Sequence, residues 1–166
     1  IIAVHPYGNT LCMVEATGQE ILDALELGCR ATTAETVGDD GLAAGEDGGF
    51  LQVSGLTYEI HTGIASSAEK DENGMFTRVS GEYRVKNVMV GGQPLELDKT
   101  YTLASHNYML LGHGDGYTMF DGCEVLGEDM MVDNQVLITY ITTTLGGVVG
   151  EQYANPYGDG RIVAVE

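Results

Sequence analysis

The fold is decided first by residues 17–30, which read TGQEILDALELGCR. Thr17 and Glu20 have the spacing of a capping box, in which the hydroxyl and the carboxylate each accept a hydrogen bond from a free backbone N–H at the start of a helix. Apolar residues then recur at helical spacing, at Ile21, Leu22, Leu25 and Cys29. This pattern predicts an amphipathic helix that runs through about Arg30.

Alternating and apolar patterns predict strands on both sides of this helix. The predicted strand segments are, in order, residues 9–15, 50–60, 76–90, 100–105 and 161–165. Gly91-Gly92 predicts a two-residue hairpin turn between residues 88–90 and 94–95. Strands joined partly by hairpins, with two helices to cover a face, predict an α+β fold with a mixed or antiparallel sheet. A doubly wound nucleotide fold is not expected.

Three other segments complete the chain. A second amphipathic helix is predicted from Asp133 or Asn134, whose side chain can cap it, to the stop signal Gly146-Gly147. Residues 31–49 combine acids with glycines and few large apolar residues, which predicts an exposed acidic loop. Residues 63–75 are polar and are also expected to form a loop.

Composition indicates a single folded domain and excludes several partners. The chain has 166 residues, of which 43% are hydrophobic, and this length is enough to bury a core without metals or disulfides. Its 25 Asp and Glu residues outnumber 7 Lys and Arg, for a net charge of -18. Because nucleic acids and anionic membranes attract basic surfaces, neither is expected as a partner. No apolar stretch approaches the roughly 18 residues of a membrane span.

The usual catalytic and metal-binding patterns are missing from the sequence. There is no Ser nucleophile elbow, no phosphate-binding P-loop and no calcium-loop ligand order. The histidines show no zinc-binding spacing; they are His5, His61, His106 and His113. The cysteines form no C-x-x-C pair and are interpreted as small buried hydrophobic residues; they are Cys12, Cys29 and Cys123.

Three features stand out as candidates for ligand binding. Phe50 lies where the acidic loop becomes a strand, and an aromatic ring there can stack on a planar ligand. Tyr108, after Asn107, lies at the end of a predicted strand. Asp115 follows Gly114 in a glycine-rich loop, where a carboxylate can approach sugar hydroxyls closely. The alternative is purely structural: Phe50 belongs to the core, Tyr108 belongs to the core or to an interface, and Asp115 bonds its own backbone in a turn.

Motifs along the chain carry a resemblance to a known family. They are HPYGNTL at 5–11, TG at 17–18 with ILDALE at 21–26, GFLQVSGL at 49–56, VGGQPL at 90–95, YTLA at 101–104 and GDGYTMF at 114–120. In this order they resemble the C-terminal domain of the 5'-nucleotidase, UDP-sugar hydrolase and 2',3'-cyclic-nucleotide phosphodiesterase family. The resemblance implies an α+β fold built as a four-layer α/β/β/α sandwich with mixed sheets.

The resemblance also implies roles for particular residues. In this family the C-terminal domain stacks the base between two aromatic rings and binds the ribose through an aspartate. By motif position these are Phe50, Tyr108 and Asp115, and the implied substrate-binding set also includes Asn107 and Gly114. Many family members have Phe where Tyr108 stands, and the loop before Gly-Asp-Gly is longer here by one residue.

The resemblance further implies that residues 1–166 are one substrate-recognition domain of a longer polypeptide. Hydrolysis belongs to an N-terminal metallophosphoesterase domain with a pair of divalent metal ions, which this chain does not contain. The chain is therefore expected to need no cofactor and to be inactive by itself. It begins with Ile1-Ile2-Ala3-Val4 and no Met, so we expect truncation before residue 1. The family's Asn-Gly-Gly-Gly-Ile-Arg segment, whose Asn and Arg contact base and substrate, would lie there.

The function that the resemblance implies is nucleoside or nucleotide recognition within a 5'-nucleotidase-like hydrolase. Its expected partners are a nucleoside or nucleotide and the N-terminal domain of the same polypeptide, without nucleic acid or membrane insertion. The implied location is secreted, periplasmic or on the cell surface. Two alternatives stay open: a nucleoside or nucleotide-sugar binding module without hydrolysis, and a structural domain of an acidic exported protein.

Overall fold

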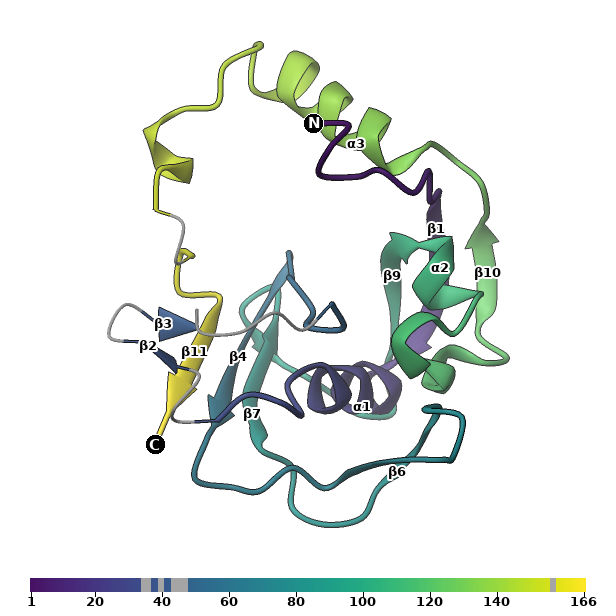
Figure 1. Ribbon diagram of the computed structural model, residues 1–166, viewed down its shortest axis with the longest axis vertical. Coiled ribbons are helices and arrows are strands. Elements are labelled where there is room, and N and C mark those ends of the chain that lie inside the picture. The colour runs from purple at the N-terminus through teal and green to yellow at the C-terminus, as the bar shows by residue number, and fades with distance from the viewer. Residues whose placement is uncertain (34–36, 39–40, 43–47, 156–157) are drawn as a thin grey trace.

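The chain forms a mixed α+β fold in the computed structural model, which describes residues 1–33, 37–38, 41–42, 48–155 and 158–166 (Figure 1). The strands are β1 (Leu11–Thr17), β2 (Val37–Gly38), β3 (Gly41–Leu42), β4 (Leu56–His61), β5 (Ala68–Lys70), β6 (Phe76–Val79), β7 (Val85–Val90), β8 (Gln93–Pro94), β9 (Thr100–His106), β10 (Glu124–Gly127) and β11 (Ile162–Val165). The helices are α1 (Gly18–Gly28), α2 (Asn107–Leu110) and α3 (Asp133–Thr139), and a π-helical turn, Tyr140–Thr144, extends α3.

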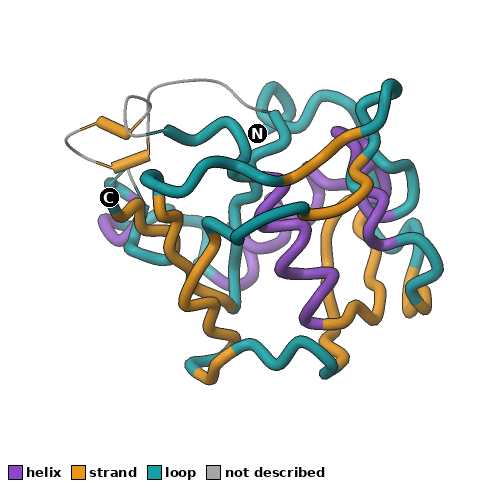
Figure 2. Tube along the Cα trace, turned by 90° about the horizontal axis from the view of Figure 1, so that it is seen from below, coloured by secondary structure: helices purple, strands orange, loops and turns teal. Residues whose placement is uncertain are grey.

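Two larger sheets flank α1. The first has the order β10-β1-β9 and is antiparallel throughout. The second has the order β11-β4-β7-β8, in which β11 is parallel to β4 and the other pairs are antiparallel. The prediction of α+β with mixed sheets is therefore confirmed, whereas the four-layer order stays a prediction. Helical segments lie between the two groups of strands in Figure 2.

The capping box that starts α1 is present as predicted. The Thr17 hydroxyl accepts a hydrogen bond from the Glu20 amide at 3.3 Å, and the Glu20 carboxylate accepts one from the Thr17 amide at 2.7 Å. The hairpin predicted at Gly91-Gly92 is also present, because it joins β7 to β8 and both glycines have positive φ. These local signals succeed because the residues that make each contact are neighbours in the sequence.

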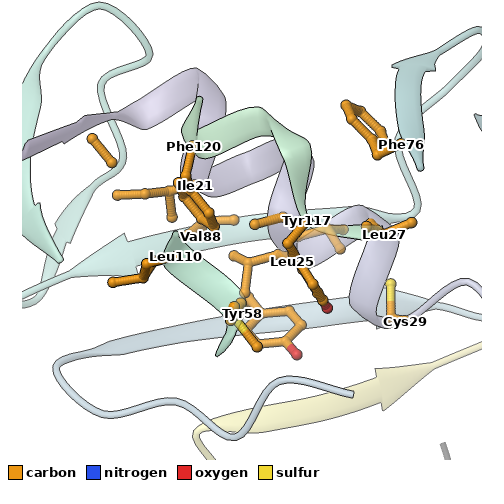
Figure 3. Packing of buried hydrophobic residues seen from close by; sticks show 14 of the residues in the cluster. Ile21, Leu25, Leu27, Cys29, Tyr58, Phe76, Val88, Leu110, Tyr117 and Phe120 are labelled. Carbon is orange, nitrogen blue, oxygen red and sulfur yellow. The ribbon is translucent and has the colours of Figure 1, made fainter. Parts of the chain in front are cut away.

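The core is built where α1 meets the sheets. Alternate residues of β1 point inward and are almost completely buried, at Cys12, Val14 and Ala16. The apolar face of α1 packs against them and against the second sheet, as Figure 3 shows for Leu25 and Leu27. All three cysteines are free. Two of them, Cys12 and Cys29, are fully buried, which confirms their interpretation as small core residues.

A buried carboxylate joins α1 to the start of β7. Glu26 is 0% exposed, and its Oε2 accepts hydrogen bonds from the amides of Arg84 and Val85, each at 2.9 Å. The Arg84 guanidinium is buried beside it and donates to the Cys29 carbonyl at 3.1 Å. Burial raises the pKa of Glu26, against the opposing effects of the two amides and the Arg84 charge. This pair fixes the helix against the second sheet.

Several predicted details are wrong. Neither Asp133 nor Asn134 caps α3 from the N-cap position, which Val132 occupies without a side-chain bond; Asp133 instead accepts from the Asn134 amide at 2.6 Å. Residues 50–55 form no strand ahead of β4, and β5 lies in a segment predicted as loop. Strand β10 was not predicted either. Most of the predicted acidic loop at 31–49 lies outside the described residues.

Candidate functional site

Tyr108, one of the two candidate rings, lies at the turn from β9 into the short helix α2. His106 caps α2, with its Nδ1 accepting from the Met109 amide at 3.3 Å. The Asn107 side-chain oxygen accepts from the Thr10 amide at 3.0 Å and from the Tyr108 amide at 2.9 Å. Asn107 therefore ties this turn to the start of β1 and fixes the backbone of Tyr108. The sequence alone indicated only that a strand ended here.

The Tyr108 ring lies against Gly114 and is open to solvent. Its exposed fraction is 47%, and a Cβ built on Gly114 would be 2.2 Å from Tyr108 Cε1. On another side the ring meets His106, with ring centroids 5.9 Å apart. Burial lowers the pKa of His106, although the charges of Asp133 and Asp115 partly oppose this. Tyr108 thus stands beside an imidazole that stays neutral more readily than an ordinary histidine.

Asp115 projects from a left-handed turn directly after Gly114. Its φ is 56° and that of His113 is 54°, a backbone region that Asp and His tolerate better than most residues. The Asp115 side chain is exposed, and no hydrogen-bond partner holds its carboxylate among the described residues. A carboxylate in this setting is free to accept two hydrogen bonds from a ligand.

Lys70, which the sequence did not single out, lies over the same turn. Its Nζ donates to the Asp115 carbonyl at 2.8 Å, although the two residues are 45 positions apart. A Cβ built on Gly116 would be 3.1 Å from the same Nζ, so the absence of a side chain at Gly116 makes room for the lysine. The site therefore contains a positive charge, whereas in the sequence all seven basic residues lie outside the candidate motifs.

Tyr117 connects the segment of Phe50 to the loop of Asp115. This tyrosine is 0% exposed, and its hydroxyl donates to the carbonyl of Gly49. A Cβ on Gly28 would be 2.8 Å from that hydroxyl, so only glycine leaves room for it at the end of α1. Figure 3 shows Tyr117 inserted among core residues of α1. The sequence signal for this contact was a large aromatic residue directly after Gly-Asp-Gly. A buried tyrosine hydroxyl usually needs a hydrogen-bond partner, so a buried Tyr117 predicts a polar contact.

Phe50 and Tyr108 are not in contact with each other. Phe50 is partly buried against the core, and the ring contacts of the described residues include none between the two candidate rings. A cavity of about 110 Å³ lies nearby, between residues 51–54 and the end of β9. Its lining is mostly apolar and includes Leu51, Val53, Leu56, Leu103, Met109 and Leu110. The structure thus brings Tyr108, Asn107, Gly114 and Asp115 together, and the Tyr117 hydroxyl links Gly49, the neighbour of Phe50, to the same loop.

The described part of the chain has neither a metal-binding group nor a membrane-spanning helix. Among the residues that the structure describes, no His, Cys, Asp and Glu side chains gather in a group of three that could hold a metal ion. None of the helices in the described ranges is long and apolar enough to cross a membrane. The groups present at the candidate site can stack on a ring and form hydrogen bonds, and they include the Lys70 and Asp115 side chains.

Gly114→Ala tests whether the position of the Tyr108 ring depends on the absence of a side chain at residue 114. Because the new methyl group would be 2.2 Å from Cε1, we expect the ring to be expelled from its position. In a nucleotide-hydrolysing full-length protein the KM should then rise about as much as in Tyr108→Ala, and the double variant should add little. Gly63→Ala is the control, since its nearest atom is 3.8 Å away. A KM equal to that of the control would contradict the expectation.

Comparison with known proteins identifies the family. The family model described as "5'-nucleotidase, C-terminal domain" matches residues 1–122. The trifunctional nucleotide phosphoesterase YfkN of Bacillus subtilis is 29% identical over 167 residues, which covers 99% of this chain and 9% of that protein. A cell wall protein of Listeria monocytogenes is 29% identical over 140 residues, covering 84% of this chain and 14% of that protein.

A solved structure agrees with this assignment. The 5'-nucleotidase precursor of Thermus thermophilus superposes with a TM-score of 0.67 and is 27% identical, over 99% of this chain and 27% of that one. The chain thus spans about a quarter or less of the length of each of these relatives. Its sequence and its fold point to the same conclusion, which is that the chain belongs to the family of 5'-nucleotidase C-terminal domains.

Proposed function

We propose that this chain is the nucleoside-recognition domain of a 5'-nucleotidase-like phosphohydrolase. The base stacks between Phe50 and Tyr108, and the ribose hydroxyls donate to Asp115. One observation carries the proposal: the Tyr117 hydroxyl bonds to the Gly49 carbonyl and so couples the Phe50 segment to the loop of Asp115. This bond supports the proposal because it links two segments that are 68 positions apart in the sequence.

The chemistry of each group suits its proposed role in binding the base, the ribose or the phosphate. Aromatic faces bind any base, because stacking uses the π-face that all bases present. The exposed Asp115 carboxylate offers two acceptor oxygens to neighbouring hydroxyls. Asn107 and Gly114 position Tyr108. The side-chain oxygen of Asn107 accepts a hydrogen bond from the Tyr108 backbone amide, and Gly114 lies against the Tyr108 ring. Lys70 provides a positive charge beside a ligand that carries phosphate.

Hydrolysis belongs, in this proposal, to an N-terminal metallophosphoesterase domain of the same polypeptide. Its divalent metal pair would stabilise the attacking and leaving oxygens of the phosphoester. Among the described residues of this chain, no group of three His, Cys, Asp or Glu side chains could hold a metal ion. We therefore expect residues 1–166 to be inactive by themselves.

The full polypeptide is proposed to act outside the cytoplasm. One relative is named as a cell wall protein and another as a precursor 5'-nucleotidase, and both names are consistent with export. The net charge of -18 disfavours nucleic acid as a partner.

Calorimetry with adenosine on the full-length polypeptide tests the proposal, with AMP hydrolysis measured in parallel. Adenosine should bind with and without divalent metal, because stacking and the Asp115 bonds need none. A chelator should abolish hydrolysis of AMP while leaving adenosine binding intact. Binding without turnover in the metal-loaded protein would indicate a binding module instead. If no nucleoside binds, the recognition role is wrong and a structural domain is favoured.

A further inference from the structure

A hairpin from a distant part of the sequence contacts the turn that carries Asp115. It consists of β5 and β6, which are antiparallel and are connected by residues 71–75. Figure 1 shows β6 below α1, with the end of the hairpin close to the short helical turns that follow α2. Its hydrogen bonds to residues 115–118 span 45 and 42 positions of the sequence. The hairpin and the turn are therefore joined by tertiary contacts.

The Asp115 turn has a backbone conformation that needs support. His113 and Asp115 both have positive φ, at 54° and 56°. Residues with a side chain are less stable in this region, so they keep such a conformation only where surrounding contacts hold it. Asp115 is exposed, so its side chain does not anchor it in the core. The contacts that hold its backbone thus decide where the carboxylate points.

One peptide group in this turn is held from both sides. The Gly116 amide donates to the His113 carbonyl at 2.9 Å, and the Asp115 carbonyl accepts from Lys70 Nζ at 2.8 Å. This amide and this carbonyl belong to the same planar peptide group, which joins Asp115 to Gly116. Fixing that plane fixes the ψ angle of Asp115. The direction of the Asp115 side chain relative to the turn is fixed with it.

The hairpin is itself anchored, so that Lys70 approaches the turn from a fixed position. The Thr118 hydroxyl donates to the Phe76 carbonyl at 2.7 Å, and Phe76 belongs to the buried core. The hairpin backbone also packs on the turn, because a Cβ built on Gly116 would be 2.3 Å from the Gly74 carbonyl oxygen. Only glycine at 116 leaves room for both this carbonyl and the lysine.

We propose that Lys70 is a positioning residue for ribose recognition. It holds the peptide group between Asp115 and Gly116, and so directs the Asp115 carboxylate at the ribose hydroxyls. This rests on the proposed function, in which Asp115 accepts hydrogen bonds from the ribose. A charged donor suits the role, because a hydrogen bond from an ammonium group is stronger than one from a neutral group.

This role differs from attraction of a phosphate by the lysine charge. A lysine that acts only on phosphate affects the binding of nucleotides and leaves nucleosides unchanged. A lysine that acts through Asp115 affects nucleosides as well, and only to the extent that they carry ribose hydroxyls. The two roles are therefore separable by the choice of ligand.

Calorimetry with adenosine and 2',3'-dideoxyadenosine on the full-length polypeptide tests this proposal. The ratio of their two Kd values measures the contribution of the ribose hydroxyls. Asp115→Ala should lower the ratio about 10- to 150-fold, the effect expected of a hydrogen bond to a charged group. Lys70→Met, which removes the donor, should lower it about threefold or more, because residues in contact are energetically coupled. The double variant should lower it no further than Asp115→Ala alone.

Two further variants serve as controls. Lys70→Arg should keep most of the wild-type ratio, because a guanidinium group can also donate to a carbonyl. This rescue distinguishes positioning from a general loss of structure. Lys86→Met should leave the ratio unchanged, since Lys86 is also a partly exposed lysine but bonds to Glu82 at 2.9 Å.

The possible failures can be told apart. If Asp115→Ala lowers the ratio and Lys70→Met does not, Lys70 does not position Asp115 and this inference alone is wrong. If Asp115→Ala has no effect on the ratio, the ribose role of Asp115 is wrong and this inference fails with it. A Lys70→Met variant that binds AMP more weakly and adenosine as tightly as wild type would show a lysine that acts only on phosphate, which also overturns the proposal.

Discussion

Replacing Phe50 with Ala in the full-length polypeptide should raise the KM for a nucleoside monophosphate about 5- to 150-fold, with a much smaller effect on kcat. Stacking a base on an aromatic ring contributes about 1–3 kcal/mol, and its loss weakens ground-state and transition-state binding alike. Tyr108→Ala should have a similar effect, whereas Tyr108→Phe should stay near wild type because the ring is retained. Steady-state kinetics of the three variants measures this.

The matched control is another exposed tyrosine. Tyr140 is 44% exposed, close to the 47% of Tyr108, and lies in the helical segment after α3. Tyr140→Ala should leave KM unchanged. If Phe50→Ala and Tyr108→Ala both behave like Tyr140→Ala, the two rings do not stack the base, whatever the enzyme hydrolyses.

Glu26→Ala should lower the free energy of unfolding by about 2–6 kcal/mol, because it leaves two buried backbone amides without their acceptor, at about 1–3 kcal/mol each. The Arg84 and Val85 amides would lose their acceptor, and the Arg84 guanidinium would lose its neighbouring negative charge. Urea unfolding of the chain measures the loss. Glu128→Ala, at an exposed position, should change stability by no more than about 0.5 kcal/mol. Equal midpoints for the two variants would contradict a structural role for Glu26.

The pH dependence of stability distinguishes the charge of Glu26 from its shape. Burial raises its pKa above the ordinary 4.5, so the folded state holds this proton more tightly than the unfolded chain does. Its contribution to stability is therefore complete below pH 4.5 and is lost as pH rises through the folded-state pKa. Relative to wild type, Glu26→Gln should become more stable as pH rises. A difference that stays constant across this range would show that Glu26 does not titrate there.

Much of the fold could be predicted because its signals are local. The Thr17 capping box and the Gly91-Gly92 turn involve residues a few positions apart, and both are present. The helix that follows β9 was harder to predict from the sequence. Helix α2 begins there because the imidazole of His106 accepts a hydrogen bond from a backbone amide, and histidine is not among the strongly preferred N-cap residues. The side-chain cap of α3 failed because the Asp133 carboxylate accepts from its own neighbour in the sequence.

The candidate site divides in the same way. Phe50, Tyr108 and Asp115 could be singled out from residue type and motif. The residues that organise them could not, because Tyr117 reaches Gly49 across 68 positions and Lys70 reaches Asp115 across 45. Contacts at such separations depend on the packing of α1 against both sheets, and periodicity in one segment contains no information about them.

The strand pairing also determines when this domain can form. Leu11 pairs with His106, and Tyr58 pairs with Ile162, so both larger sheets join segments that are far apart in the sequence. Synthesis as far as residue 99 provides β1 and α1 without β9, and β11, one of the two strands that pair with β4, follows later still. Such high contact order favours slow folding, after synthesis instead of during it.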